Sequence, residues 1–244
     1  MKQGIFEIVE NIALTDSVYR MQLQGDTSAI TAPGQFVNIQ LDGLYLRRPI
    51  SVCDVTGDIL TIIYKVVGKG TKQMSQMRNG KLDLLTGLGN GYDLTAAGES
   101  PVLLGGGVGV PPMYMLAKEL IALGKKVNVI LGFNTKDEFF YEEEFKALGC
   151  SVTVTTVDGS YGLKGFVTDA LKDMEYSYFY TCGPEPMLKA VYRASVTSGQ
   201  MSFEKRMGCG FGACMGCSCK TITGYKRICK EGPVMRKEEI LWED

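Results

Sequence analysis

The sequence predicts an α/β protein plus an all-β part: an N-terminal antiparallel β-barrel, a doubly wound parallel-sheet domain, and a cysteine-rich C-terminal segment. Three observations lead to this prediction. Short apolar runs separated by turns fill the N-terminal part, apolar runs and helical stretches alternate after it, and cysteines gather near the end. Hydrophobic residues make up 45% of the 244 residues, which is enough for two packed cores.

The N-terminal part, from residue 4 to about 95, contains β-type runs bounded by turn-forming residues. Glycine and proline mark the turns Ala32-Pro33-Gly34 and Thr56-Gly57-Asp58. Short strands at this spacing predict an antiparallel barrel. The runs are Gly4–Asn11, Val18–Gln24, Gln35–Leu41, Pro49–Val55 and Ile59–Val67.

From Pro101 onward, apolar runs alternate with helical stretches, as in βαβ units that build a parallel sheet. The expected strands are Val102–Leu104, Val127–Leu131, Val152–Val157 and Tyr178–Thr181. The expected helices are Met113–Leu123, Glu138–Leu148, Thr168–Met174 and Met187–Ser198. Beyond Gly199 the chain is too polar and irregular to bury a core without a cofactor. We therefore expect a barrel over 1–97, a nucleotide domain over 98–200 and a cluster segment over 201–244.

Composition excludes several classes of function. The 26 basic and 27 acidic residues give no electrostatic footprint for nucleic acid or anionic lipid. The chain has no histidine, which excludes imidazole ligands and Ser-His-Asp hydrolysis. The N-terminus lacks a secretory apolar region, and no stretch approaches the roughly 20 apolar residues that cross a bilayer. We expect a soluble, cytoplasmic protein that binds neither nucleic acid nor membrane.

The cysteine spacing is the strongest chemical signal. Five of the eight cysteines lie in the C-terminal segment, four of them as Cys209-x4-Cys214-x2-Cys217-x11-Cys229. Three thiolates on one loop and a distant fourth can enclose a pair of irons, and the glycines between them let backbone amides approach the sulfides. We predict a [2Fe–2S] cluster on these four cysteines, with a four-thiolate zinc site as the alternative. Cys219 is too close to Cys217 to ligate beside it.

Two barrel segments have the composition of a diphosphate site. In Arg48-Pro49-Ile50-Ser51 the arginine can hold a phosphate and the hydroxyl can lie near a flavin ring. The alternative is an arginine pair that solvates a strand end. The second segment is Ile63-Tyr64-Lys65 with the glycine turn that follows it, where Gly70 permits a tight turn and Thr71 can begin a helix with amides facing phosphate. Two such segments together favour a nucleotide cofactor.

Two turns of the second domain follow predicted strands and precede predicted helices. Gly105-Gly106-Gly107-Val108-Gly109 leads into a helix with prolines in its first turn, a place where a dinucleotide phosphate can bind. Cys182-Gly183-Pro184 has the same position after its own strand. Each could be an ordinary βα turn, but in a doubly wound sheet both lie at the carboxyl edge, where ligands bind.

In combination these motifs resemble the ferredoxin–NADP reductase superfamily over nearly the whole chain. The resemblance rests on Arg48-Pro49-Ile50-Ser51, Gly70-Thr71, the run from Gly105 to Pro112, and Cys182-Gly183-Pro184. With the cysteine motif added, the sequence is similar to the electron-transfer subunits of class 1B dihydroorotate dehydrogenases. In the loop Thr86–Tyr92, Gly87 replaces the proline of the superfamily, and the role of this loop stays open.

The resemblance implies an FAD site and an NAD site. The FAD residues would be Arg48 on the diphosphate, Ser51 facing the flavin, and Pro49, Ile50, Ile63, Tyr64, Lys65, Gly70 and Thr71. Superfamily reductases often have tyrosine where Ile50 stands, so the flavin contact there is apolar or comes from another aromatic such as Tyr64. The NAD residues would be Gly105, Gly106, Gly107, Gly109, Cys182, Gly183 and Pro184, with Cys182 near the nicotinamide and not acting as a nucleophile.

The resemblance also implies a partner. A separate FMN-containing catalytic subunit would oxidise dihydroorotate in pyrimidine biosynthesis, within a heterotetramer of two of each, and this chain would carry no catalytic residue of its own. The segment Gly132–Asp137 lacks the arginine that usually clamps a 2′-phosphate, which favours NAD over NADP. The alternatives are a subunit of an NAD(P)H:ferredoxin transhydrogenase or cytoplasmic hydrogenase, and a zinc-stabilised binding module without redox activity.

Overall fold

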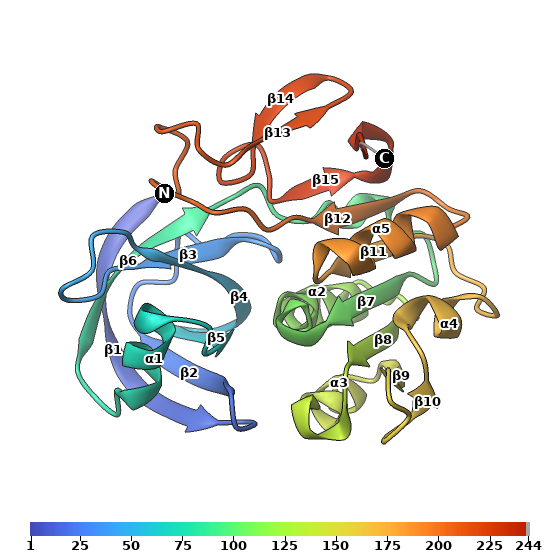
Figure 1. Cartoon of the computed structure of the whole chain (residues 1–244), viewed down its shortest axis with the longest axis horizontal. Helices are drawn as coiled ribbons and strands as arrows, with labels where there is room; N and C mark the ends of the chain where they lie inside the picture. Colours follow the sequence, from blue (N-terminus) through green and yellow to red (C-terminus); the bar gives the residue numbers. More distant parts are fainter. Residues whose placement is uncertain (243–244) are drawn as a thin grey trace.

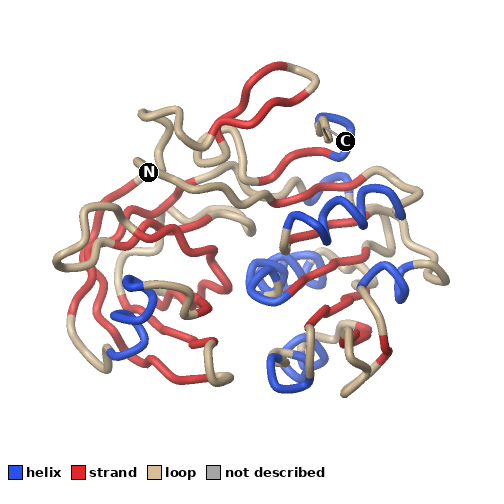
Figure 2. The backbone as a smooth tube through the Cα atoms, viewed as in Figure 1, coloured by secondary structure: helices blue, strands red, loops and turns tan. Residues whose placement is uncertain are grey.

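A computed structural model describes residues 1–242 as a barrel, a mixed sheet and a small hairpin that pack together (Figure 1). Strands make up most of the barrel half, whereas helices and strands alternate in the other half (Figure 2). The predicted combination of an antiparallel barrel with a parallel-sheet domain is therefore confirmed.

The barrel closes in the order β1-β2-β5-β4-β3-β6. Its strands are β1 (Lys2–Ala13), β2 (Val18–Gln24), β3 (Phe36–Ile39), β4 (Arg48–Thr56), β5 (Ile59–Lys65) and β6 (Lys81–Leu88). Alternation of side chains fills its interior, as on β3, where Val37 and Ile39 point into the barrel core. Helix α1 (Lys69–Gln76) packs against the barrel, and its Met74 side chain is buried in the barrel core.

The second sheet has the order β10-β9-β8-β7-β11-β12-β15 and is parallel except for its last strand. Its strands are β7 (Val102–Gly106), β8 (Asn128–Phe133), β9 (Ser151–Thr156), β10 (Leu163–Lys164), β11 (Phe179–Cys182), β12 (Gly199–Ser202) and β15 (Val234–Arg236). The helices on its faces are α2 (Pro111–Ala122), α3 (Glu142–Ala147), α4 (Val167–Leu171) and α5 (Glu185–Ala194). The strand order reverses beside β7, which is where such sheets bind ligands.

One hydrophobic core joins the two halves. Val18, Cys53 and Ile63 of the barrel share a buried cluster with Leu116 and other residues of α2. Helix α2 therefore lies between the barrel and the sheet, and the carboxyl edge of the sheet faces β5.

The C-terminal segment is more ordered than its composition indicates. A hairpin of β13 (Ser218–Thr221) and β14 (Gly224–Arg227) stands above the sheet, and β15 returns to pair with β12 (Figure 1). Ile228 and Met235 are buried in the same cluster as Phe36 of β3. The segment forms no core of its own, and its apolar residues are instead buried against the two larger parts.

Three expected element boundaries are also wrong. Helix α1 begins at Lys69 and not at Thr71, because the Thr71 hydroxyl accepts the backbone N–H groups of Val67 and Gly68 from inside the first turn. The expected helix Glu138–Leu148 is interrupted by Tyr141, whose φ of 74° breaks the helical path. The expected helix Met187–Ser198 runs instead over Glu185–Ala194, since Pro184 and Pro186 suit its start.

Several short helices of three residues complete the described chain at Leu94–Ala96, Gly107–Gly109, Lys136–Glu138 and Lys237–Glu239. No helix within residues 1–242 is both long and apolar enough to cross a membrane.

Candidate functional site

Arg47, just before β4, and Arg48, its first residue, have different surroundings. The guanidinium of Arg47 is engaged by the barrel itself, donating to the Asp83 carboxylate at 2.9 Å and to the Asp83 carbonyl at 3.0 Å. Arg48 lies instead against Gly70, where an added Cβ would sit 2.3 Å from Arg48 Nε. Of the two, Arg48 is therefore the one that lies beside α1, and its Nη1 also donates to the carbonyl groups of Leu46 and Arg47.

The first turn of α1 completes this anion site. The backbone N–H groups at the start of a helix have no partner within the helix, and the absence of a side chain at Gly70 lets Arg48 approach them. Ser51 lies three residues along β4. Within residues 1–242 its hydroxyl makes no hydrogen bond that would occupy it. These residues fit an FAD whose diphosphate lies at Arg48 and α1.

Tyr64 does not offer its ring to a flavin. Its side chain lies in the barrel core, 2% exposed, and its hydroxyl donates to Asn11 Oδ1 at 3.0 Å. Burial raises the pKa of Tyr64 to about 12. Since β5 alternates, the side chains of Ile63 and Lys65 face outward toward the second domain. Of the two expected flavin contacts, an apolar one and one from Tyr64, the contact from Tyr64 therefore does not fit the structure.

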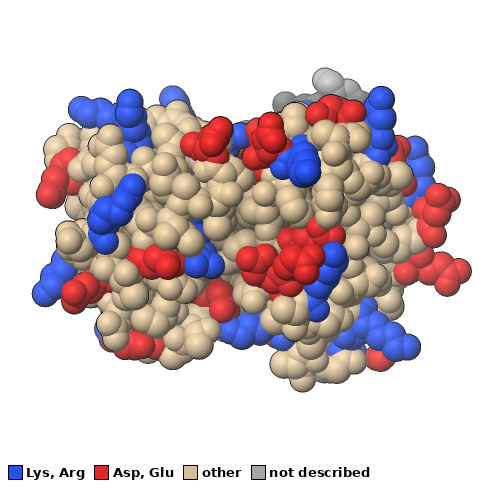
Figure 3. Space-filling view, turned by 90° about the horizontal axis from the view of Figure 1, so that it is seen from below, with Lys and Arg blue, Asp and Glu red and all other residues tan. Residues whose placement is uncertain are grey.

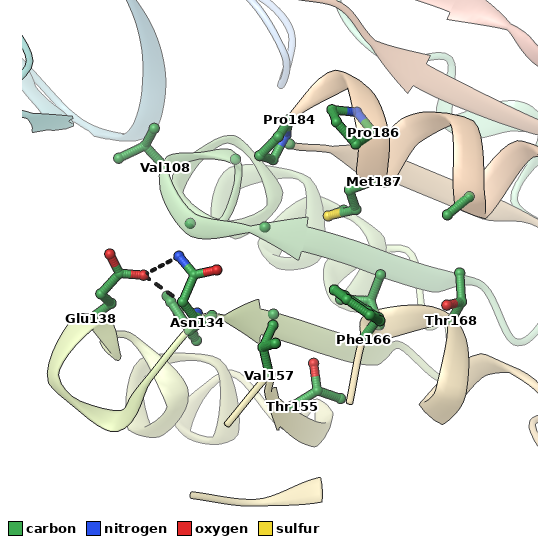
Figure 4. A pocket seen from close by; sticks show the side chains of 18 of the residues that line it. Val108, Asn134, Glu138, Thr155, Val157, Phe166, Thr168, Pro184, Pro186 and Met187 are labelled. Atoms are coloured by element: carbon green, nitrogen blue, oxygen red, sulfur yellow. Dashed lines mark hydrogen bonds between the residues drawn. The ribbon is translucent and has the colours of Figure 1, made fainter. Parts of the chain in front are cut away.

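A cavity of about 610 Å³ lies at the carboxyl edge of the parallel sheet (Figure 4). Predicted residues on its wall are Gly106, Gly107, Gly109, Gly183 and Pro184. Lys65 of β5 lies on the same wall. The cavity is thus shared between the nucleotide domain and the barrel strand that carries part of the FAD motif.

The two turns over this cavity touch through their backbones. A Cβ at Gly109 would lie 2.2 Å from the Cys182 carbonyl oxygen, and one at Gly105 would lie 2.8 Å from the Cα of Val110. Glycine at position 109 lets the turns after β7 and β11 meet, and glycine at position 105 lets the turn after β7 fold back on itself. Gly105 and Cys182 are not among the residues that line the cavity.

Cys182 is a buried, neutral thiol. It is 2% exposed, and burial raises its pKa to about 12. A neutral thiol is a poor nucleophile, which agrees with the expectation that Cys182 does not act as one.

Other wall residues were missed from the sequence. Phe133, Phe166 and Met187 supply apolar surface, and Asn134 and Glu138 supply polar groups after β8 (Figure 4). Glu138 accepts a hydrogen bond from Asn134 Nδ2 at 2.7 Å. It also forms an ion pair with Lys65, with Lys65 Nζ 3.1 Å from Glu138 Oε1. These contacts offset the partial burial of Glu138 and hold its pKa below the usual value.

The four predicted cluster ligands form two thiol pairs. Cys217 and Cys229 are buried, with their Sγ atoms 3.2 Å apart. Cys209 and Cys214 lie nearer the surface, and the Cys209 backbone N–H donates to Cys214 Sγ at 3.4 Å. A [2Fe–2S] cluster takes two thiolates on each iron, so the two pairs match its two irons. Cys219 belongs to neither pair.

Backbone amides donate to a sulfur of the outer thiol pair, which is formed by Cys209 and Cys214. Cys209 Sγ accepts the N–H groups of Ala213 at 3.2 Å and Cys214 at 3.4 Å. Partial burial opposes ionisation of Cys209, but these amides outweigh it and lower the pKa to about 6. Gly210 and Gly212 make the necessary turns at φ values of 79° and 93°.

The glycine loop whose role the sequence left open ties three parts together. Asn90 donates to the Val234 carbonyl at 2.7 Å and accepts from the Val234 N–H at 3.1 Å. The hydroxyl of Tyr92, which is buried, donates to the Thr181 carbonyl at 3.1 Å. This loop therefore fixes the C-terminal segment and β11 to the barrel.

The three candidate sites follow the order of three neighbouring barrel strands. The cysteine loop contacts β3 through a hydrogen bond from Asn38 to the Cys209 carbonyl, β4 carries Arg48 and Ser51, and β5 reaches the cavity with Lys65. Since β4 lies between β3 and β5, the candidate FAD residues Arg48 and Ser51 lie between the strand that the cysteine loop contacts and the strand that reaches the cavity.

Comparison with protein families gives two matches. Residues 204–241 match the iron-sulfur cluster binding domain of dihydroorotate dehydrogenase B, and residues 103–193 match an oxidoreductase NAD-binding domain. Similar curated proteins are named dihydroorotate dehydrogenase B (NAD(+)), electron transfer subunit. One from Fusobacterium nucleatum is 43% identical and one from Bacillus pumilus is 42% identical, covering 96% and 98% of both chains respectively.

Solved structures agree with this fold. A chain from the structure of an NADH-dependent reduced ferredoxin-NADP oxidoreductase superposes with a TM-score of 0.88 at 30% identity, covering 98% of this chain and 90% of that one. A ferredoxin NADP+ reductase from Neisseria gonorrhoeae with bound FAD and NADP gives a TM-score of 0.70 at 18% identity, covering 80% and 90%. The second likeness concerns the fold alone.

Proposed function

The chain belongs to the family of dihydroorotate dehydrogenase B electron transfer subunits, and from this we propose that it passes electrons from a dihydroorotate-oxidising, FMN-containing partner to NAD⁺. The observation that carries the proposal is the order of sites on β3, β4 and β5: cysteine loop, FAD residues and NAD cavity. When bound, the [2Fe–2S] cluster supplies one-electron transfer, and FAD converts single electrons into a hydride for the nicotinamide.

The side chains of this chain would bind and orient the cofactors. Arg48 and the amides of α1 would hold the FAD diphosphate, and Ser51 would lie at the flavin. The glycine turns at Gly107 and Gly183 would take the dinucleotide against their backbones. No side chain of the chain is needed as a proton carrier, in agreement with the absence of histidine.

The outer thiol pair suits electron entry from a partner. Cys214 is exposed, and Phe211 and Met215 beside it are 43% and 55% exposed. Exposed apolar side chains around a redox centre are typical of a protein contact surface. We propose that the FMN subunit docks here, in a cytoplasmic heterotetramer of two of each subunit.

We further propose NAD as the nicotinamide substrate in preference to NADP. The carboxylate of Glu138 stands at the end of β8, where doubly wound folds discriminate a ribose hydroxyl from a 2′-phosphate. Basic and acidic side chains both occur over the face seen in Figure 3, so we base the preference on the local carboxylate and not on a surface charge of one sign.

The test is anaerobic purification of the chain from its native cells, followed by an assay for dihydroorotate-dependent NADH formation. A co-purifying flavoprotein with this activity is the expected result. A brown FAD-containing complex that is inert toward dihydroorotate would contradict the proposal. It would favour an NAD(P)H:ferredoxin transhydrogenase subunit, for which the 30% identity to the NADH-dependent ferredoxin-NADP oxidoreductase is the specific support.

A further inference from the structure

Asn38 is an amide on the outer face of the barrel that is not among the predicted site residues, although it contacts the cysteine loop. It lies on β3, where it pairs with Pro49 of β4 on one side and Leu85 of β6 on the other. Its neighbours Val37 and Ile39 point into the barrel core, so Asn38 points outward. The cysteine loop covers it, leaving it 1% exposed.

The contact between Asn38 and the loop is a close one. Asn38 Nδ2 donates to the Cys209 carbonyl at 3.2 Å, across 171 residues of sequence. The next residue, Gly210, lies directly over the amide: a Cβ there would be 2.3 Å from Asn38 Nδ2, and its φ of 79° favours glycine. The loop is therefore shaped to accept this side chain.

Packing alone does not explain an amide at this position. Asn38 Oδ1 is buried and accepts no hydrogen bond from residues 1–242. Burying a polar atom without a partner destabilises the fold, and an apolar side chain of the same shape would avoid this. What the amide adds is one directed hydrogen bond to the main chain of a cluster ligand.

The strand beneath Asn38 is held in place from the other side. Arg47 Nη1 donates to the Asn38 carbonyl at 3.3 Å and to the Asp83 carboxylate at 2.9 Å. The partner of Asn38 in the ladder, Pro49, follows Arg48 and precedes Ile50 and Ser51 in the FAD motif. One residue thus connects the Cys209 main chain to the strand that carries the FAD site.

We propose that Asn38 is a positioning residue that sets the geometry between the [2Fe–2S] cluster and FAD. It fixes Cys209 relative to β4, and since electron tunnelling depends steeply on distance and orientation, this hydrogen bond keeps transfer between the two cofactors fast. The inference rests on the proposed function only in placing FAD at β4 and the cluster at the cysteines.

The test compares Asn38→Leu, which keeps the size and removes the amide, with the wild-type complex. Iron content, FAD content and NADH-to-dye turnover at FAD should be unchanged, because the hydrogen bond that the Asn38 side chain donates goes to the Cys209 carbonyl and not to a candidate FAD residue. Cluster reduction by NADH, followed by stopped-flow absorbance, should slow about tenfold or more, as small misplacements of reacting groups commonly cause. The EPR signal of the reduced cluster should broaden, because Cys209 is no longer held in one orientation.

The matched control is Gln40→Leu, an amide two residues along whose side chain bonds Leu44 in the neighbouring loop and not the cysteine segment. It should leave both the reduction rate and the EPR signal unchanged. If Asn38→Leu lost iron, Asn38→Asp, which keeps the shape and loses the donor, would decide the matter by the same two readouts. Wild-type rates and spectra in an iron-loaded variant, or equal effects in the Gln40 control, would overturn the inference.

These measurements use NADH and need no dihydroorotate. A complex inert to dihydroorotate but with slowed cluster reduction in Asn38→Leu would refute the proposed function and support this inference. Dihydroorotate turnover with no effect of Asn38→Leu would do the reverse.

Discussion

The NAD cavity and the cysteine loop use backbone and side chains in opposite ways. The cavity is lined at its turns by backbone, and its key positions are glycines whose missing side chains let β7 and β11 meet. In the cysteine loop the side chains are the proposed ligands, while backbone amides donate to the Cys209 sulfur and glycines make the turns. A cavity of the first kind fails when atoms are added, and a site of the second kind fails when a ligand atom is exchanged.

The largest expected effect is at the cysteine loop. Cys214→Ser should abolish electron transfer between the partner FMN and NAD⁺, because a serine hydroxyl does not replace a thiolate on iron. Much of the NADH-to-dye activity should remain, since FAD and NAD are held by other parts of the chain. The two activities and the visible spectrum of the purified complex provide the measurement.

Cys219→Ser is the matched control for that change, because Cys219 lies on the adjacent strand β13 and in neither thiol pair. It should leave the cluster spectrum and both activities intact. Equal loss of dye reduction and coupling in folded Cys214→Ser would contradict the separation of the two regions.

The next effect tests the backbone-built region. Gly109→Ala would place a methyl group 2.2 Å from the Cys182 carbonyl, so the turns after β7 and β11 must move apart. We expect kcat/KM for NADH to fall about 100-fold, as misplacement of bound groups by an ångström can do, with FAD and iron retained. Steady-state dye reduction measures this loss.

Gly107→Ala in the same turn meets no atom within 4 Å, although its φ of 53° is unfavourable for alanine. It should cost less than Gly109→Ala. A larger effect at Gly107 would show that conformation, and not the contact between the turns, governs the cavity.

In both regions the sequence predicts the site residues that lie close together along the chain. Cys209, Cys214, Cys217 and Cys229 are predicted together because their spacing is typical of [2Fe–2S] ligands. The glycines of the cavity were identified for a related reason, since a turn between strand and helix leaves a local signature. In both cases neighbouring residues carry the chemical constraint.

Residues that act across long separations left no such signature. Phe133 and Phe166 look like ordinary core residues, and the role of Asn38 depends on a contact 171 residues away. Glu138 directly follows the segment Gly132–Asp137, whose lack of arginine favours NAD, but the sequence pattern places Glu138 in a predicted helix. Nothing local therefore marks it as a residue of the cavity wall.

The FAD site combines both modes and should give an intermediate effect. Arg48→Ala removes one charged partner of the diphosphate while the amides of α1 remain, so FAD binding should weaken about 10- to 100-fold, as the loss of about 1.5–3 kcal/mol implies. Flavin release on dilution, followed by fluorescence, measures this. The substitution leaves Gly70 and the α1 turn in place.

Arg47→Ala is the control, because Arg47 is bonded to Asp83 and not to the candidate FAD site. It should lower thermal stability with little change in FAD affinity. The Arg47 hydrogen bond holds the pKa of Asp83 below its usual value, so the stabilisation is present above the unfolded pKa of about 3.9 and is lost as the pH falls through the folded value. The difference in Tm between Arg47→Ala and wild type should therefore shrink in acid; a difference that grew would refute this account.

The smallest expected effect is at a side chain within the backbone-built cavity. Glu138→Gln removes a negative charge from the wall and leaves Lys65, its ion-pair partner at 3.1 Å, free to attract a phosphate. A repulsion of about 1 kcal/mol between charges about 4 Å apart in a water-like medium corresponds to about a fivefold change in binding, so the preference for NADH over NADPH should fall by about this factor. The ratio of kcat/KM values for the two substrates is the measurement, with Asp137→Asn as a neighbouring acid outside the cavity wall. An unchanged ratio in Glu138→Gln would mean that the backbone turns alone select the dinucleotide. The cavity would then depend even less on side chains than we infer from its comparison with the cysteine loop.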